Sequence, residues 1–252
     1  MILTLILLIS STLWGANAHS DLSAGIQGRT GPSIGAEANL DAGYNFVFWG
    51  EKKEKKDVLY GLVRPSVVLS TSGVINAAKA ELEFFPISFL GIAVGRQIIH
   101  SNYDFKFFKC KEIICKGEFH RNYVEGKMAL GAKGWIAVGH YKVDVVTAPN
   151  SRLPMADWRN VIVGNNGGDT QIERKLILGK FIGNQMFGVL LENVRFKDSE
   201  EMRESYTGAY QLKHNDNSYM MAIGVYKTSQ VPLGGIIYFR FNSTLIPSSK
   251  LF

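Results

Sequence analysis

The strict alternation of side chains over residues 34–49, IGAEANLDAGYNFVFW, limits the possible folds more than any other feature. Even positions carry Ile, Ala, Leu, Tyr and Phe, whereas odd positions carry Gly, Glu, Asn and Asp as far as Asn45. Successive side chains of a β-strand point to opposite faces. The segment therefore predicts one long strand with an apolar face and a polar face.

Eleven further segments show alternation or turn residues of the same kind, with less clear faces over 171–181 and 218–227. The predicted strands cover residues 22–29, 34–49, 58–70, 74–84, 88–99, 119–132, 134–147, 171–181, 185–196, 205–213, 218–227 and 233–246. An even number of strands in a closed barrel places both chain termini on one side. The fold predicted is all-β: a closed, antiparallel, up-and-down transmembrane barrel of about twelve strands.

The connections between these strands alternate in length, as expected of such a barrel. Those on the side of the termini are residues 50–57, 85–87, 133, 182–184 and 214–217. The two longest connections, residues 100–118 and 148–170, fall on the other side together with residues 197–204. Aromatic residues at that outer end would form an interfacial belt, and they are Tyr103, Phe105, Tyr123, Tyr206 and Tyr226.

The first eighteen residues, MILTLILLISSTLWGANA, have an apolar run followed by Ala16-Asn17-Ala18, which is typical of an export signal cleaved before His19. Residues 19–252 would then form the barrel domain. The mean hydropathy of +0.02 and the absence of another long apolar run exclude helical membrane spans. Barrel strands of about 9–11 alternating residues are not excluded by such an average.

The signal, the alternating segments, the alternating connection lengths and the terminal Phe252 together resemble the outer-membrane β-barrel class of Gram-negative bacteria. The resemblance covers the whole mature chain and rests on pattern. It implies residence in the outer membrane, contact with outer-membrane lipid and lipopolysaccharide, and insertion by the barrel-assembly machinery, which reads an aromatic last residue. A closed barrel satisfies all backbone groups and has no exposed edge.

The formal charge of +6 and the pI of 9.2 do not indicate a nucleic-acid partner. Basic residues are mixed with acidic ones along the chain, and the densest run, EKKEKKD at residues 51–57, carries both signs. Such mixed runs are usually solvated turns.

Charged residues in the polar registers predict the lining of the barrel interior. The candidates are Arg64, Lys79, Glu81, Glu83, Glu125, Lys127, His140, Lys142, Asp144, Lys213 and Arg240. Charges on opposite walls would make a pore for passive passage of small polar solutes, whereas charges paired across the lumen would plug it. We favour the pore, because about twelve strands lie between the filled eight-stranded barrel and the open channels. The near balance of signs argues against strong ion selectivity.

The alternative is a closed structural or adhesive barrel whose outer loops bind surface partners. The loop of residues 100–118 supplies candidate contacts, which are Tyr103, Phe105, Lys106, Phe107, Lys109, Lys111 and Lys116. Cys110 and Cys115 in this loop predict a local disulfide, as is usual for an even cysteine count in an exported protein. The second long loop, residues 148–170, could fold inward as a constriction.

Enzymatic activity is the third and weakest hypothesis. Residues 99–103, IHSNY, are similar to the His-x-Ser-Asn motif of outer-membrane lipid hydrolases. His100 and Ser101 are adjacent, however, and neighbours on a strand face opposite sides. No spacing typical of a metal or cofactor site occurs, so the sequence predicts neither a cofactor nor an enzyme.

Overall fold

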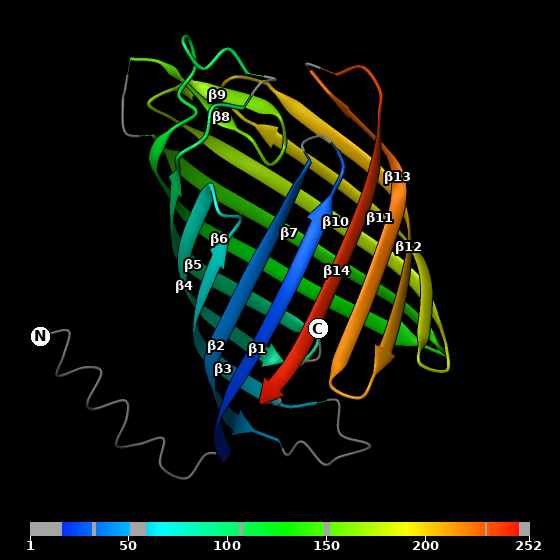
Figure 1. Cartoon of the computed structure of the whole chain (residues 1–252). Helices are drawn as coiled ribbons and strands as arrows, with labels where there is room; N and C mark the ends of the chain where they lie inside the picture. Colours follow the sequence, from blue (N-terminus) through cyan, green and yellow to red (C-terminus); the bar gives the residue numbers. More distant parts are fainter. Residues whose placement is uncertain are drawn as a thin grey trace, which may run out of the picture.

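A computed structural model describes residues 17–31, 34–50, 59–105, 108–148, 152–229 and 231–246 as a closed barrel (Figure 1). Twelve strands form the barrel, and each is antiparallel to both neighbours. The first strand pairs with the last, for example Ile26 with Phe241, so the sheet has no free edge. No helix of the described residues is long and apolar enough to cross a membrane.

All twelve predicted strands are confirmed, with ends shifted by a few residues. The barrel strands are β1 (Asn17–Arg29), β2 (Gly35–Trp49), β3 (Gly61–Thr71), β4 (Ile75–Ile87), β5 (Leu90–Ser101), β6 (Gly117–Ala132), β7 (Trp135–Thr147), β10 (Gly168–Ile182), β11 (Gln185–Phe196), β12 (Met202–His214), β13 (Asn217–Thr228) and β14 (Gly234–Ile246). Two short strands missing from the prediction, β8 (Pro154–Asp157) and β9 (Ile162–Asn166), form a hairpin within the connection from β7 to β10.

The two ends of the barrel differ, as the connection lengths predict. Both chain ends of the barrel and short turns such as Lys133-Gly134 lie at one end, called here the turn end. Both residues of that turn have positive φ (50° and 82°), the geometry of a tight hairpin turn that matches strand twist. The β8–β9 hairpin and the longest connections lie at the other end, called here the loop end (Figure 1).

Three predictions concern residues at the margins of the described chain. β1 begins at Asn17, which pairs with Val47, so the strand starts two residues before the predicted cleavage point. Residues 1–16, most of the predicted signal, lie outside the described residues. The terminal Phe252 lies outside them as well.

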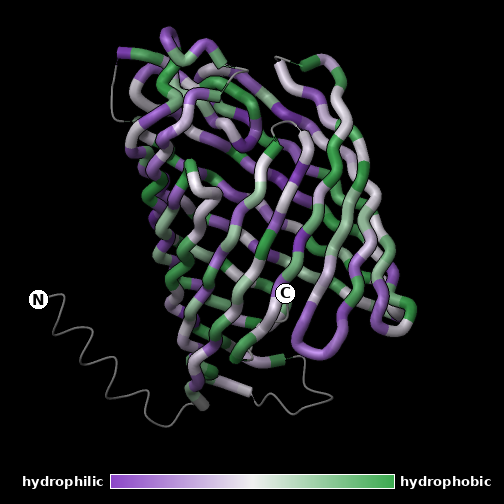
Figure 2. The backbone as a smooth tube through the Cα atoms, in the orientation of Figure 1, coloured by the Kyte–Doolittle hydropathy of each residue, from purple (hydrophilic) through white to green (hydrophobic). Residues whose placement is uncertain are grey.

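The outer surface of the barrel is apolar. Large hydrophobic side chains are exposed on the outward registers, including Val67, Leu69, Val124, Met128 and Leu130. Figure 2 shows polar and apolar residues alternating along the strands. An exposed apolar surface around a closed sheet is the arrangement that a lipid bilayer stabilises.

The buried apolar side chains lie mainly at the loop end. One cluster joins inward residues such as Phe119 and Val194 to the β8–β9 hairpin, which contributes Met155, Trp158 and Ile162. A smaller cluster of Val47, Tyr60, Leu62 and Phe85 lies near the turn end. Between the two clusters, the interior is polar.

Candidate functional site

The inner face of the barrel carries ion pairs between strands that are not adjacent. Arg64 on β3 contacts Asp21 on β1, and Lys127 on β6 contacts Glu83 on β4. In a closed sheet, only the concave face brings side chains together across a skipped strand. These charged residues therefore line the interior, opposite the exposed apolar registers.

Arg64 is the centre of the first cluster. Its guanidinium Nη2 lies 2.5 Å from Asp21 Oδ1 and 2.8 Å from Asp41 Oδ1, and Nη1 lies 3.1 Å from Glu83 Oε2. Only 2% of the Arg64 side chain is exposed. A buried guanidinium is tolerated where hydrogen-bonded carboxylates surround it, and here β1, β2 and β4 supply them.

Glycine at position 43 makes room for this arginine. Gly43 lies on the inward register of β2, and a Cβ added there would lie 2.4 Å from Cζ of Arg64. Real side chains do not approach so closely, so any other residue would displace the guanidinium. The glycine of the polar register in residues 34–49 thus has a packing role that alternation alone does not reveal.

The cluster continues around the wall to β7. Lys127 Nζ lies 2.7 Å from Glu83 Oε1 and 3.6 Å from Glu125 Oε2, and Glu125 also contacts His140 Nδ1 at 2.9 Å. The remaining predicted residues on this wall pair with each other, Lys79 with Glu81 and Lys142 with Asp144. All nine predicted lining residues between Arg64 and Asp144 therefore belong to one wall of ion pairs.

Tyr123 links the parts of this wall. Its hydroxyl donates to Glu81 Oε2 at 2.6 Å, and Lys142 Nζ lies 4.2 Å from the centre of its ring. The prediction of Tyr123 in an outer aromatic belt is wrong, because the ring is buried on the inner face. Tyr226, also buried, packs against Gly234 and is not part of an outer belt either.

A second cluster lies on β10, β11 and β12, and sequence reasoning missed it. Lys175 contacts Glu173 and lies 3.2 Å from Glu192 Oε1, while Arg203 also contacts Glu192. In β10 apolar residues occupy both registers near Leu176, Ile177 and Leu178, so the polar face is not evident from the sequence. Asp21, Asp41 and Arg121 were also missed; Asp41 stands in the polar register of residues 34–49 and could have been included.

The last two predicted lining residues stand apart from both clusters. Lys213 lies near the turn end of β12 and Arg240 on β14, and both are exposed. Arg240 donates a hydrogen bond within its own strand, since its Nε lies 3.2 Å from Asn242 Oδ1. Neither residue has an ion pair with a described residue.

Exposure varies widely among the paired acidic and basic groups of the interior. The side chains of Glu83 and Asp144 are 1% and 0% exposed, and that of Arg64 is 2% exposed. Asp41 is 27% exposed and Lys175 is 36% exposed. Groups of both signs therefore reach the interior space.

The β8–β9 hairpin reaches into the mouth of the barrel from the β7–β10 connection. Its turn residues contact three separate parts of the wall: Asp157 accepts from Arg121 and Gln171, Asn160 accepts from Arg203, and Arg159 Nη2 lies 3.1 Å from Glu37 Oε2 on β2. The contacts therefore extend from β6 and β10 to β12 and β2. The predicted inward fold of this loop is observed.

Asp157 is the most buried charge of the hairpin. Burial by itself would raise its pKa, but the positive charge of Arg121 and hydrogen bonds from Gln171 and Asn160 outweigh burial and lower the pKa to about 2. The carboxylate also accepts backbone N–H groups of Arg159 and Asn160, which fixes the turn. Asp157 thus holds the hairpin against the wall as long as it is ionised.

Aromatic side chains pack against Trp158 of the hairpin. Trp158 stacks on Phe105 with ring centres 5.9 Å apart and meets Phe119 edge-on at 5.1 Å. Phe105 therefore packs against the hairpin, although the sequence made it a candidate for surface binding. The backbone of Ile114 bonds to Pro154 and Ala156, which ties the two long loops together.

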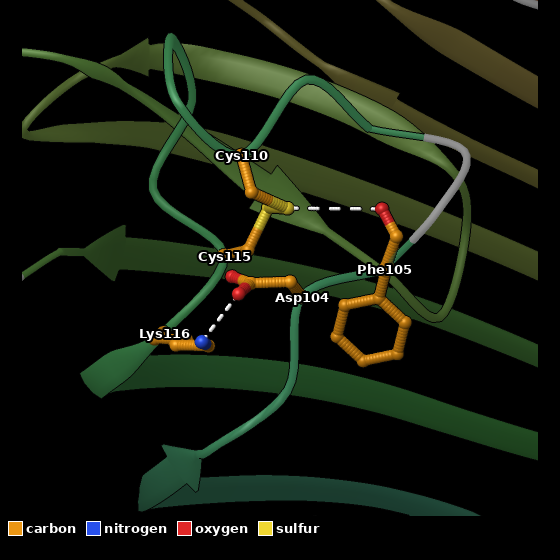
Figure 3. The surroundings of a disulfide bond; sticks show 5 residues. All are labelled: Asp104, Phe105, Cys110, Cys115 and Lys116. Carbon is orange, nitrogen blue, oxygen red and sulfur yellow. Dashed lines mark hydrogen bonds and ion pairs between the residues drawn. A yellow bond between two sulfur atoms is a disulfide. The ribbon is translucent and has the colours of Figure 1, made fainter.

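The predicted disulfide between Cys110 and Cys115 is present (Figure 3). Cys110 Sγ lies 3.7 Å from the carbonyl oxygen of Phe105, and Lys116 pairs with Asp104. Among the predicted surface contacts, Tyr103, Lys109, Lys111 and Lys116 are exposed. Lys106 and Phe107 lie outside the described residues.

His100 and Ser101 do not form a nucleophile and base pair. His100 is exposed on the outward register, whereas Ser101 is buried on the inward one. The Ser101 hydroxyl has no hydrogen-bond partner among the described residues. The described residues also contain no group of three or more His, Cys, Asp or Glu side chains placed to hold a metal ion.

Comparison with solved structures supports this architecture. An outer membrane channel from Pseudomonas putida F1 superposes with a TM-score of 0.56 over 90% of this chain and 96% of that chain, at 7% sequence identity. The chain has the outer-membrane β-barrel fold. The KdgM porin in complex with disordered oligogalacturonate (TM-score 0.43, 10% identity, 90% of this chain and 98% of that chain) and LpxR from Salmonella typhimurium (0.46, 6%, 89% and 99%) are less similar. No family model and no curated protein sequence matches the chain.

Proposed function

We propose that this barrel is a water-filled pore that passes small polar solutes across the bacterial outer membrane. The proposal rests on the arrangement of the ion pairs, which join residues along the barrel wall. Lys127, Lys142 and Lys175 pair with carboxylates on their own or nearby strands. Paired in this way, these lysines follow the wall of the twelve-stranded barrel and do not bridge its centre, and the contacts described across the mouth are those of the β8–β9 hairpin.

The β8–β9 hairpin would be the constriction of this pore. Arg159 is the part of the hairpin that reaches β2, and its side chain is 53% exposed although it pairs with Glu37. The positive charge of an exposed arginine beside the path of solutes attracts anions and repels cations. Together with the partly exposed Lys175 and the exposed Arg240, it favours small anionic solutes modestly over cationic ones.

Orientation and targeting complete the proposal. The predicted signal of residues 1–18 would direct export and be removed, and the barrel-assembly machinery would insert the mature chain. The turn end would then face the periplasm and the loop end the cell exterior, as in barrels with short periplasmic turns.

Reversal potentials across a planar bilayer under a salt gradient test both the pore and its preference. The sharpest change is Arg240→Glu, because Arg240 faces the interior without an ion pair that the change would break. We expect the reversal potential of this variant to shift in the direction of greater cation selectivity. Lys180→Glu is the matched control, since Lys180 is exposed on the outward register over the ring of Trp135. Equal reversal potentials for both variants and the original chain would show that the interior charges do not determine ion selectivity.

The adhesive alternative rests on the exposed lysines of the disulfide loop. Lys109, Lys111 and Lys116 face solvent on a loop held by its disulfide and by β8. A variant lacking residues 106–116 should then lose binding to cell surfaces while the barrel still folds. Intact binding would dismiss this alternative.

A further inference from the structure

Arg96 lies on the outward, apolar face of the barrel. It occupies the outward register of β5 between Val94 and Ile98, which are 44% and 40% exposed. Its guanidinium is exposed and makes no hydrogen bond or ion pair with any described residue. A full charge thus faces the lipid side of the sheet without a partner from the described part of the chain.

The position of Arg96 coincides with a change in the polarity of this face. Asn122 of β6 stands directly opposite Arg96 in the register. Toward the turn end, the outward residues of the two strands are apolar or glycine: Leu90, Ile92, Val94, Val124, Gly126, Met128 and Leu130. Toward the loop end they include His100, His120 and Glu118. Apart from Ile98, the outward residues of β5 and β6 above this pair are polar or charged, so Arg96 and Asn122 mark a boundary in the polarity of this face.

A charge at this boundary can recruit an anion. An arginine on the lipid face is costly near the bilayer centre and is tolerated near the interface, where its long side chain reaches polar groups. The nearby acidic residue, Glu118, lies four residues above Asn122 on β6 and already contacts His120 at 3.1 Å. An anionic group of the membrane is therefore the partner that this position favours.

We propose that Arg96 and Asn122 bind a phosphate of the lipid A anchor of lipopolysaccharide in the outer leaflet. Guanidinium groups bind phosphate oxygens through two parallel N–H bonds, and the Asn122 amide adds a further donor. The exposed Val94 and Val124, which lie on the turn-end side of Arg96 and Asn122, would contact the acyl chains beside the bound headgroup. The site rests on the proposed orientation and does not require an open lumen.

A similar pair on the other side of the barrel provides a comparison. Arg174 of β10 is also outward and exposed, and it stands opposite Asn193. Its guanidinium lies 5.7 Å from the centre of the Tyr141 ring, and Asn193 contacts Glu204 at 3.4 Å. The second pair has partners within the protein, whereas Arg96 has none among the described residues.

Native mass spectrometry of the folded full chain in detergent tests the site. The probes are lipid A with its phosphates, the same lipid A without them, phosphatidylglycerol and inorganic phosphate. We expect the original chain to retain phosphorylated lipid A, and Arg96→Gln to weaken this binding about tenfold, the effect of losing one strong charge-assisted contact. Lys180→Gln removes an outward charge at the turn end and should bind as the original chain does. Arg96→Lys should bind with intermediate affinity, because it keeps the charge but not the two parallel bonds.

Several results would overturn the proposal. Equal binding of phosphorylated lipid A by Arg96→Gln and the original chain would remove Arg96 from the site. Equal binding of lipid A with and without phosphates would reject phosphate as the recognised group. Phosphatidylglycerol or inorganic phosphate bound as tightly as lipid A would reject the assignment to lipopolysaccharide. A heat-dependent gel shift of each variant shows that the barrel is folded, so altered binding reports on the site.

Discussion

The wall and the mouth of this barrel both contain ion pairs, but these pairs connect different kinds of structure. At the wall, Arg64 on β3 contacts carboxylates on β1, β2 and β4, which all lie within two strands of β3 in the sheet. At the mouth, Arg159 joins a loop to a strand 122 residues away in sequence. Wall pairs therefore stabilise the barrel itself, whereas mouth pairs hold the β8–β9 hairpin in the mouth of the barrel. If this distinction is correct, substitutions at the wall should mainly change the stability of the barrel, and substitutions at the mouth should mainly change its conductance.

The largest effect is expected at Arg64. Arg64→Ala leaves three carboxylates together, two of them almost fully buried, and should destabilise the barrel by about 3–5 kcal/mol, the usual cost of breaking a buried ion pair. Denaturant unfolding in detergent measures this change. Gly43→Ala, which displaces the same guanidinium without removing it, should destabilise in the same direction. A loss below about 1 kcal/mol, typical of surface pairs, would contradict a structural role for the wall.

A second prediction concerns the pH dependence of the mouth. The pKa of Asp157 lies at about 2 when the hairpin is docked, compared with 3.8 for a free side chain. Its ionised form therefore stabilises docking by about 2 kcal/mol above pH 4, and this contribution is lost as the pH falls from 4 to 2. Single-channel conductance should rise over that range. Asp157→Asn should abolish the pH step, and a step of unchanged size in this variant would assign it to another group.

A smaller effect on stability, with a clear effect on passage, is expected at Arg159. Arg159→Ala should change the free energy of unfolding by less than about 1 kcal/mol, because the arginine is more than half exposed to water. It should still increase single-channel conductance and reduce anion preference, since it removes a cation from the constriction. Glu37→Gln is the matched change on the other side of the pair. Conductance equal to that of the original chain in both variants would show that the hairpin does not narrow the path.

The smallest effect on the barrel itself is expected from the disulfide. Reducing Cys110–Cys115 opens a short loop, for which chain entropy gives roughly 2 kcal/mol, confined to the loop. Trypsin cleavage at Lys109 and Lys111 should accelerate, while the heat-dependent gel shift of the barrel stays the same. A Cys110→Ser and Cys115→Ser variant should behave as the reduced chain does. A barrel that loses its gel shift on reduction would contradict the separation of loops from wall.

The wall was predictable from the sequence because strand geometry is local. Alternation over residues 34–49 and the polar registers of β4, β6 and β7 place their charges inside without knowledge of the partners. β10 was harder, since apolar residues at both Leu176 and Ile177 obscure the face that carries Lys175. The outward Arg96 interrupts an apolar register, and a sequence pattern does not distinguish such an exception from a strand end.

The mouth could be predicted only in part. Prolines, Trp158 and the length of residues 148–170 indicate a structured loop, but the contacts of Asp157, Arg159 and Asn160 involve strands far away in sequence. Such pairings depend on how the closed barrel places β2, β6, β10 and β12 around the mouth. They are a consequence of the tertiary fold.

Single-channel recording of the folded mature chain in a planar bilayer tests the central claim most directly. Because the wall charges pair along the sheet and not across it, we predict discrete current steps of reproducible size that become larger in Arg159→Ala. A barrel that shows its heat-dependent gel shift but passes no current, both as the original chain and as Arg159→Ala, would contradict an open lumen.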